Sequence, residues 1–82
     1  MTFGVDIDWP GHHQRGILTD EHSASSYGIT VLVFGGRAYG TADLMPDVKI
    51  TALWKKARIG PVWAIIQRAI DVGYPIEIDP VG

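Results

Sequence analysis

The chain has 82 residues, of which 46% are hydrophobic, and its formal net charge at pH 7 is −2. This length predicts one domain, residues 1–82, and the apolar content excludes an intrinsically disordered chain. The absence of cysteine excludes disulfides and thiolate metal sites, and no apolar run approaches the roughly 20 residues of a membrane helix. Because the first residues lack the basic and apolar regions of a signal peptide, we expect a cytoplasmic protein without a membrane partner.

Two strands are expected at the start of the chain. Residues 2–9 alternate between apolar and polar side chains, and this period of two predicts a half-buried β-strand. The Pro-Gly pair at 10–11 ends the strand, and residues 13–19 follow as a second strand antiparallel to the first. Within this second strand, Gly16 indicates a bulge or a close approach of another backbone. A polar, serine-rich loop covers residues 20–28.

A hairpin is expected in the middle of the chain. The run ITVLVF, residues 29–34, is apolar at five of six positions, which is typical of a strand buried on both faces. Gly35 and Gly36 follow, and they predict a tight turn because both central residues of a type I′ turn need positive φ. The residues after 36 then form the returning strand.

Two helices and a final strand are expected in the last third. Residues 50–58 place apolar side chains at helical spacing, so we favour a short helix there over a strand that the same residues also fit. Residues 61–73 form the clearest helix, since Pro61 suits its first position and Gly73 suits the residue past its end. Residues 74–79 then read as a C-terminal edge strand, because prolines interrupt its hydrogen bonding.

These elements predict an α+β fold, in which a small and mostly antiparallel sheet carries one long amphipathic helix. One helix covers one face of a small sheet, whereas a strand that is apolar on both faces needs two covers. The N-terminal hairpin or a second copy of the chain must supply the other cover. We therefore expect a homo-oligomer, most simply a C2 dimer.

Charge is distributed unevenly along the chain. Residues 48–70 hold five basic residues and no acid, whereas residues 1–47 hold six acids and two arginines, and residues 71–82 hold three acids and no base. The basic segment contains WKKARIGPVW, whose aromatic and cationic side chains are favoured at interfaces. The predicted contact residues are Trp54, Lys55, Lys56, Arg58 and Trp63.

This basic segment has three interpretations. An acidic protein, including the acidic ends of a second copy, is the partner that its charge fits. The simplest alternative is that both tryptophans belong to the core and the cations form a solvated face. A weak single-stranded nucleic-acid site over residues 49–68 is a further alternative, although the net charge argues against a dedicated nucleic-acid binder.

The segment DIDWPGHHQRG suggests a divalent metal site. Asp6 and Asp8 share one face of the first strand, and the turn after Trp9 returns His12 or His13 toward them. Carboxylate and imidazole ligands together suit zinc. However, adjacent histidines in a strand face opposite sides, and the spacing matches no known metal signature. The simpler interpretation is the solvent-facing half of an amphipathic strand, so no cofactor is predicted and zinc remains the alternative.

The leading hypothesis is a small self-associating binding or interaction module rather than an enzyme. Small ligands fit best between the helix and the sheet, against Trp and Tyr side chains. The alternative is a metal-binding and hydrolytic protein that uses the carboxylates and one histidine of the N-terminal segment.

Overall fold

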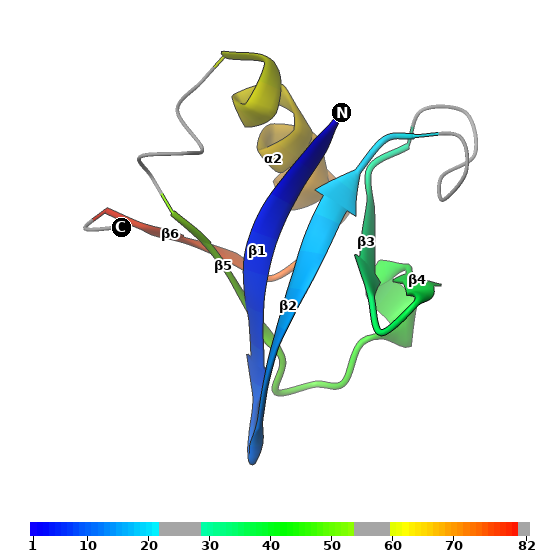
Figure 1. Cartoon of the computed structure of the whole chain (residues 1–82), viewed down its shortest axis with the longest axis vertical. Helices are drawn as coiled ribbons and strands as arrows, with labels where there is room; N and C mark the ends of the chain where they lie inside the picture. The colour runs from blue at the N-terminus through cyan, green and yellow to red at the C-terminus, as the bar shows by residue number, and fades with distance from the viewer. Residues whose placement is uncertain (22–28, 54–59, 81–82) are drawn as a thin grey trace.

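A computed structural model describes residues 1–21, 29–53 and 60–80, which form a small α+β fold. The strands are β1 Thr2–Trp9, β2 His12–Thr19, β3 Val31–Phe34, β4 Arg37–Tyr39, β5 Lys49–Leu53 and β6 Ile76–Asp79. A 3₁₀ helix, η1 Thr41–Asp43, follows β4, and the α-helix α2, Gly60–Val72, lies between β5 and β6 in the chain. The strands form one mixed six-stranded sheet in the order β4-β3-β2-β1-β5-β6 (Figure 1).

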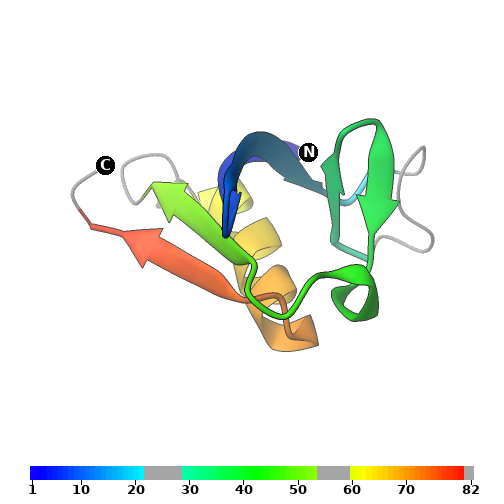
Figure 2. The same cartoon turned by 90° about the horizontal axis from the view of Figure 1, so that it is seen from below.

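The core lies between α2 and one face of the sheet. Figure 2 shows α2 on one side of a strongly curved sheet. Alternation along each strand turns every second side chain toward α2. The buried apolar residues are Phe3, Val5, Ile7, Leu18, Leu32, Val48, Ile50, Ala52, Ile65, Ile66, Ala69 and Tyr74. No helix among the described residues has the length and apolarity needed to cross a bilayer.

The long β1–β2 hairpin forms the centre of the sheet. Its two-residue turn pairs Trp9 with His12, and the register continues without a bulge along both strands. Gly16 of β2 lies at a close contact, because a Cβ added there would lie 2.5 Å from Ile7 Cδ1 and 3.0 Å from the Val33 carbonyl oxygen. The close backbone approach expected at this glycine is therefore confirmed.

In the part of the chain that the structure describes, strand β3 is buried on one face only. Leu32 is fully buried toward α2, whereas the other three residues of β3 remain partly exposed. The turn to β4 passes through Gly35 and Gly36, whose φ values are +58° and +75°. Glycine adopts such values at no steric cost, so the Gly-Gly pair favours a turn at this position.

The prediction of a helix over residues 50–58 is wrong for residues 50–53, which belong to β5. Residues 54–58 lie outside the described residues. Ile50 and Ala52 are fully buried, because β5 pairs antiparallel with β1 and parallel with β6. Pairing on both sides outweighs the helical spacing of apolar side chains in this segment. The last strand, β6, lies at the edge of the sheet.

Helix α2 is buried along a narrower stripe than its sequence suggests. Ile65, Ile66 and Ala69 are buried, whereas Ile70 and Val72 are 37% and 51% exposed. The apolar half of this helix therefore extends beyond the part that the sheet covers.

The C-terminus of α2 is a Schellman motif. Gly73 has φ of +106°, its N–H donates to the Ile70 carbonyl at 3.0 Å, and the Tyr74 N–H donates to the Ala69 carbonyl at 3.0 Å. This reversal delivers Tyr74 to the core, where it is 5% exposed.

Tyr74 joins the end of α2 to the β3–β4 hairpin. Its hydroxyl donates a hydrogen bond to the Tyr39 carbonyl at 2.6 Å and accepts one from the Leu32 N–H at 3.3 Å. Burial raises the pKa of this phenol, so the hydroxyl keeps the proton that it donates. One side chain therefore holds backbone groups of two neighbouring strands.

Removal of this hydroxyl should destabilise the fold. Tyr74→Phe leaves the Leu32 N–H and the Tyr39 carbonyl without this partner, so we expect the free energy of unfolding to fall by about 1–3 kcal/mol. Urea denaturation followed by circular dichroism measures the change. Tyr39→Phe is the matched control, because it removes a hydroxyl but keeps the carbonyl that Tyr74 contacts. An equal loss in both variants would contradict the role assigned to Tyr74.

Candidate functional site

Three aromatic rings form a row at one end of the sheet, on the face that α2 covers. Trp9 ends β1, Phe34 ends β3 and Tyr39 ends β4, and we call these three rings the aromatic row. The Phe34 and Tyr39 rings stack at 4.0 Å with 9° between their planes. The Trp9 and Phe34 centroids are 6.0 Å apart and their planes are tilted by 43°. The space between Trp9 and Phe34 is therefore a wedge rather than a parallel slot.

The two outer faces of the row are already covered. The His12 ring stacks on the Trp9 ring, with 5.1 Å between their centroids. The Arg37 guanidinium lies 5.0 Å from the Tyr39 centroid, and it occupies the face opposite Phe34 because Phe34 already stacks on the other. The wedge between Trp9 and Phe34 is the part of the row left for another group.

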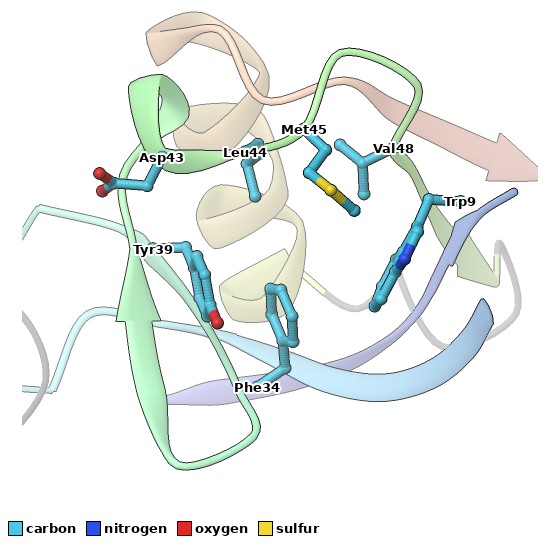
Figure 3. Close-up of a pocket in the computed structure, with 7 residues that line it drawn as sticks. All are labelled: Trp9, Phe34, Tyr39, Asp43, Leu44, Met45 and Val48. Atoms are coloured by element: carbon cyan, nitrogen blue, oxygen red, sulfur yellow. The ribbon is translucent and has the colours of Figure 1, made fainter. Parts of the chain in front are cut away.

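The wedge opens into a pocket of about 250 Å³ (Figure 3). Its other wall comes from the chain between β4 and β5. The lining residues are Trp9, Phe34, Tyr39, Asp43, Leu44, Met45 and Val48. Met45 is 53% exposed, and in Figure 3 its thioether points between the Trp9 and Phe34 rings. The pocket is thus mostly apolar and partly filled by a flexible side chain of its own wall.

Short-range hydrogen bonds fix this wall. The Asp43 N–H donates to the Gly40 carbonyl at 3.0 Å, and the Gly40 N–H donates to Asp43 Oδ2 at 2.9 Å. Further along, the Val48 N–H donates to the Met45 carbonyl at 3.2 Å, and Val48 is buried. Asp43 therefore lies at the Tyr39 end of the pocket, where its own turn holds the carboxylate, and in Figure 3 this carboxylate points away from the Trp9 and Phe34 rings.

The opposite face of the sheet, which no described helix covers, carries the N-terminal carboxylates. This helix-free face is defined by Asp6, Asp8, His13, Arg15, Ile17, Val31, Val33 and Lys49. Asp8 Oδ1 lies 2.6 Å from His13 Nδ1, and Asp6 Oδ1 lies 3.3 Å from Arg15 Nε. Lys49 faces Asp8 from the other side across the β1–β5 pairing. Asp8 thus lies between basic side chains of both neighbouring strands, whereas Asp6 lies between Arg15 and Thr51.

The structure brings three of the four residues proposed as metal ligands together and places the fourth, His12, on the opposite face of the sheet. His13 joins the carboxylates, with its Nε2 also 4.0 Å from Asp6 Oδ1, whereas His12 lies on the other face against Trp9. Among the described residues, no group of three or more His, Cys, Asp or Glu side chains is arranged to hold a metal ion. The arrangement is that of cross-strand charge pairs, and nothing in its geometry favours zinc.

The contact surface predicted from the basic segment is described only in part. The residues Trp54, Lys55, Lys56 and Arg58 lie outside the described residues. Trp63 is half-buried on α2 and packs against the core. Lys49 lies on the helix-free face. On α2, Arg68 Nη1 lies 3.6 Å from Oδ2 of Asp20, the residue after β2. An acidic-partner or nucleic-acid surface over 49–68 therefore stays a prediction.

Sequence reasoning expected Trp and Tyr side chains at a ligand site between the helix and the sheet, whereas this pocket contains Trp9 and Tyr39 but no residue of α2. Part of the signal for its actual position was present in the sequence. A two-residue turn at 35–36 pairs residue 34 with residue 37, so Phe34 and Tyr39 lie diagonally on one face. Met45 and Asp43 carry no such signal, because they reach the pocket through the path of the chain between β4 and β5.

Comparison with known proteins identifies no relative: no family model, curated protein or solved structure matches the chain. The assignment of a function therefore rests on the pocket and on the helix-free face.

The His13–Asp8 pair makes stability depend on pH. The hydrogen bond that the His13 ring donates to the Asp8 carboxylate raises the pKa of His13 above its ordinary value of 6.5. Because the folded state binds this proton more tightly, the stabilisation is complete below the unfolded pKa and is lost as pH rises through the folded pKa.

The free energies of unfolding of the wild type and of His13→Gln should therefore differ most at about pH 6 and least at about pH 8. Chemical denaturation across this range gives the two curves, and NMR titration of the His13 ring gives its pKa directly. His12→Gln is the control and should keep the pH dependence of the wild type. Parallel curves for wild type and His13→Gln would contradict this assignment.

Proposed function

We propose that this protein is a small binding module whose recognition site is the pocket between Trp9, Phe34 and Met45. The observation that carries the proposal is the pocket itself, an apolar concavity walled by aromatic rings with one carboxylate at its end. Ligand sites in proteins have this character, although drug-sized ligands fill larger ones of about 300–1,000 Å³. The volume of about 250 Å³ suits a fragment-sized ligand or one side chain of a partner.

The distribution of titratable groups supports binding rather than catalysis. The Asp8–His13 pair, the closest described contact between a carboxylate and an imidazole, is exposed on the helix-free face, on the far side of the sheet from the pocket. The pocket carboxylate, Asp43, is held by the Gly40 N–H. An acid–base pair and a concavity that would hold a substrate therefore do not coincide in the described residues.

Binding at the pocket is tested with indole as a neutral aromatic probe in saturation-transfer NMR. We expect transfer to the wild type and a loss of transfer in Met45→Arg, because a guanidinium at the mouth of the wedge blocks it and costs desolvation. Ile70→Arg is the matched control, since Ile70 is also an exposed apolar residue but lies on α2. Indole bound equally by both variants would place recognition elsewhere, and no transfer to the wild type would contradict the proposal.

We also propose that the module self-associates through the helix-free face. Ile17 pairs with Val33 across β2 and β3, and Val31 lies two residues along, so three partly exposed apolar side chains are adjacent there. Ile17 is 36% exposed, although it lies in an interior strand of the sheet. A contiguous apolar patch beside charged rows is typical of a protein interface.

A second copy fits this face because its charges alternate in sign from strand to strand. The acids on β1 pair with basic side chains on β2, Lys49 on β5 faces Asp8, and β6 adds Glu77 at the far end. Each copy therefore offers both signs, and a two-fold axis is able to place basic strands opposite acidic ones.

Self-association is measured by sedimentation velocity at tens of micromolar. We expect the wild type to sediment as a dimer and Val33→Lys as a monomer, because a charge in the apolar patch stays unpaired in the interface. Ala64→Lys, at an exposed position on α2, should leave the dimer intact. A monomeric wild type would contradict this part of the proposal and leave the pocket untouched.

A further inference from the structure

We infer that the pocket binds a methylated ammonium group, an inference that rests on the proposed binding function and specifies its ligand. The aromatic row, the acidic wall and the exposed methionine at the mouth each contribute to it.

The shape of the wedge favours a rounded group over a planar one. The Trp9 and Phe34 planes diverge by 43° with centroids 6.0 Å apart, so a flat ring between them contacts one face well and the other poorly. A tetrahedral N-methylated ammonium at the open end contacts both tilted faces at once. A cation within about 6 Å of a ring centroid is attracted by the negative face of the ring, most strongly by Trp.

Met45 shows what kind of group this space accepts. Its thioether points between the two rings in Figure 3, and a thioether methyl is close in size and shape to an N-methyl group. The side chain is 53% exposed and unbranched, so it is able to swing out and release the space at little cost. The position of the Met45 terminus is therefore the position we assign to the ammonium.

The chain segment that walls the pocket carries a net negative charge, although neither acid is placed in the wedge itself. Residues 38–48 carry two acids, Asp43 and Asp47, and no basic residue. Asp43 lines the pocket, and its Oδ2 is fixed by the Gly40 N–H. The nearest described guanidinium, Arg37, lies beyond the Tyr39 ring, which together with Phe34 separates it from the wedge. Arg37 on the outer face of Tyr39 also shows that this row accepts a cation on a ring face.

The test compares choline with 3,3-dimethyl-1-butanol, which has the same shape but no charge. The chain contains two methionines, so labelling with ¹³C-methyl methionine gives a Met45 signal in the pocket and a Met1 signal as an internal reference. Titration of either compound is followed by the displacement of the Met45 signal. We expect choline to bind about threefold to thirtyfold more tightly than its neutral analogue.

Two variants separate the contributions of charge and ring. Asp43→Asn keeps the acceptor for the Gly40 N–H but removes the charge, so the preference for choline should fall, whereas Asp47→Asn in the same segment should change it less. Phe34→Leu keeps an apolar side chain but removes a ring face. It should therefore weaken the binding of choline more than the binding of the neutral compound. ¹⁵N–¹H spectra establish that each variant is folded.

The outcomes are distinct. A clear preference for choline that Asp43→Asn and Phe34→Leu both reduce supports the inference. Equal or tighter binding of 3,3-dimethyl-1-butanol overturns the ammonium assignment but leaves the proposed apolar binding site standing. Failure of both compounds to move the Met45 signal overturns the ammonium assignment, while binding of indole in the separate saturation-transfer experiment still decides the proposed function.

Discussion

The hydroxyl of Tyr74 is the contact that joins the hairpin of the pocket to the end of α2. It accepts from the Leu32 N–H and donates to the Tyr39 carbonyl, so it fixes two strands of the same hairpin to the end of α2. Phe34 and Tyr39 extend from that hairpin, and their distance from Trp9 on β1 follows from the pairing of β3 with β2 and of β2 with β1, together with this contact. Gly73 makes this possible, since its positive φ turns the chain so that Tyr74 enters the core.

The sheet divides the molecule into two chemically different sides. On the side of α2, the core ends in a pocket lined by aromatic rings, which is the proposed recognition site. On the helix-free face, carboxylates of β1 alternate with basic side chains of β2 and β5 beside an apolar patch. Ligand binding and self-association thus use opposite faces, so neither proposed interaction needs to exclude the other.

Features set by local backbone chemistry were predictable from the sequence. The alternation in residues 2–9, the paired glycines at 35–36 and the glycine after α2 each specify a conformation within a few residues. The strand over residues 49–53 was not predictable in this way, because its apolar residues also have helical spacing. Its pairing with β1 and β6, which depends on residues distant in the sequence, decides the outcome. The pocket was out of reach for the same reason, since Met45 meets Trp9 only through the path of the chain around the sheet.

The most direct test of this account is the chemical shift of the Met45 methyl group in the free protein and in Tyr74→Phe. If Tyr74 holds the rings around the pocket, ring currents from Trp9 and Phe34 should displace the wild-type Met45 signal well upfield of Met1. In folded Tyr74→Phe, the Met45 signal should move back toward the position of an unstructured methionine. A Met45 signal that is the same in both folded proteins would show that the pocket does not depend on Tyr74, and would contradict the account.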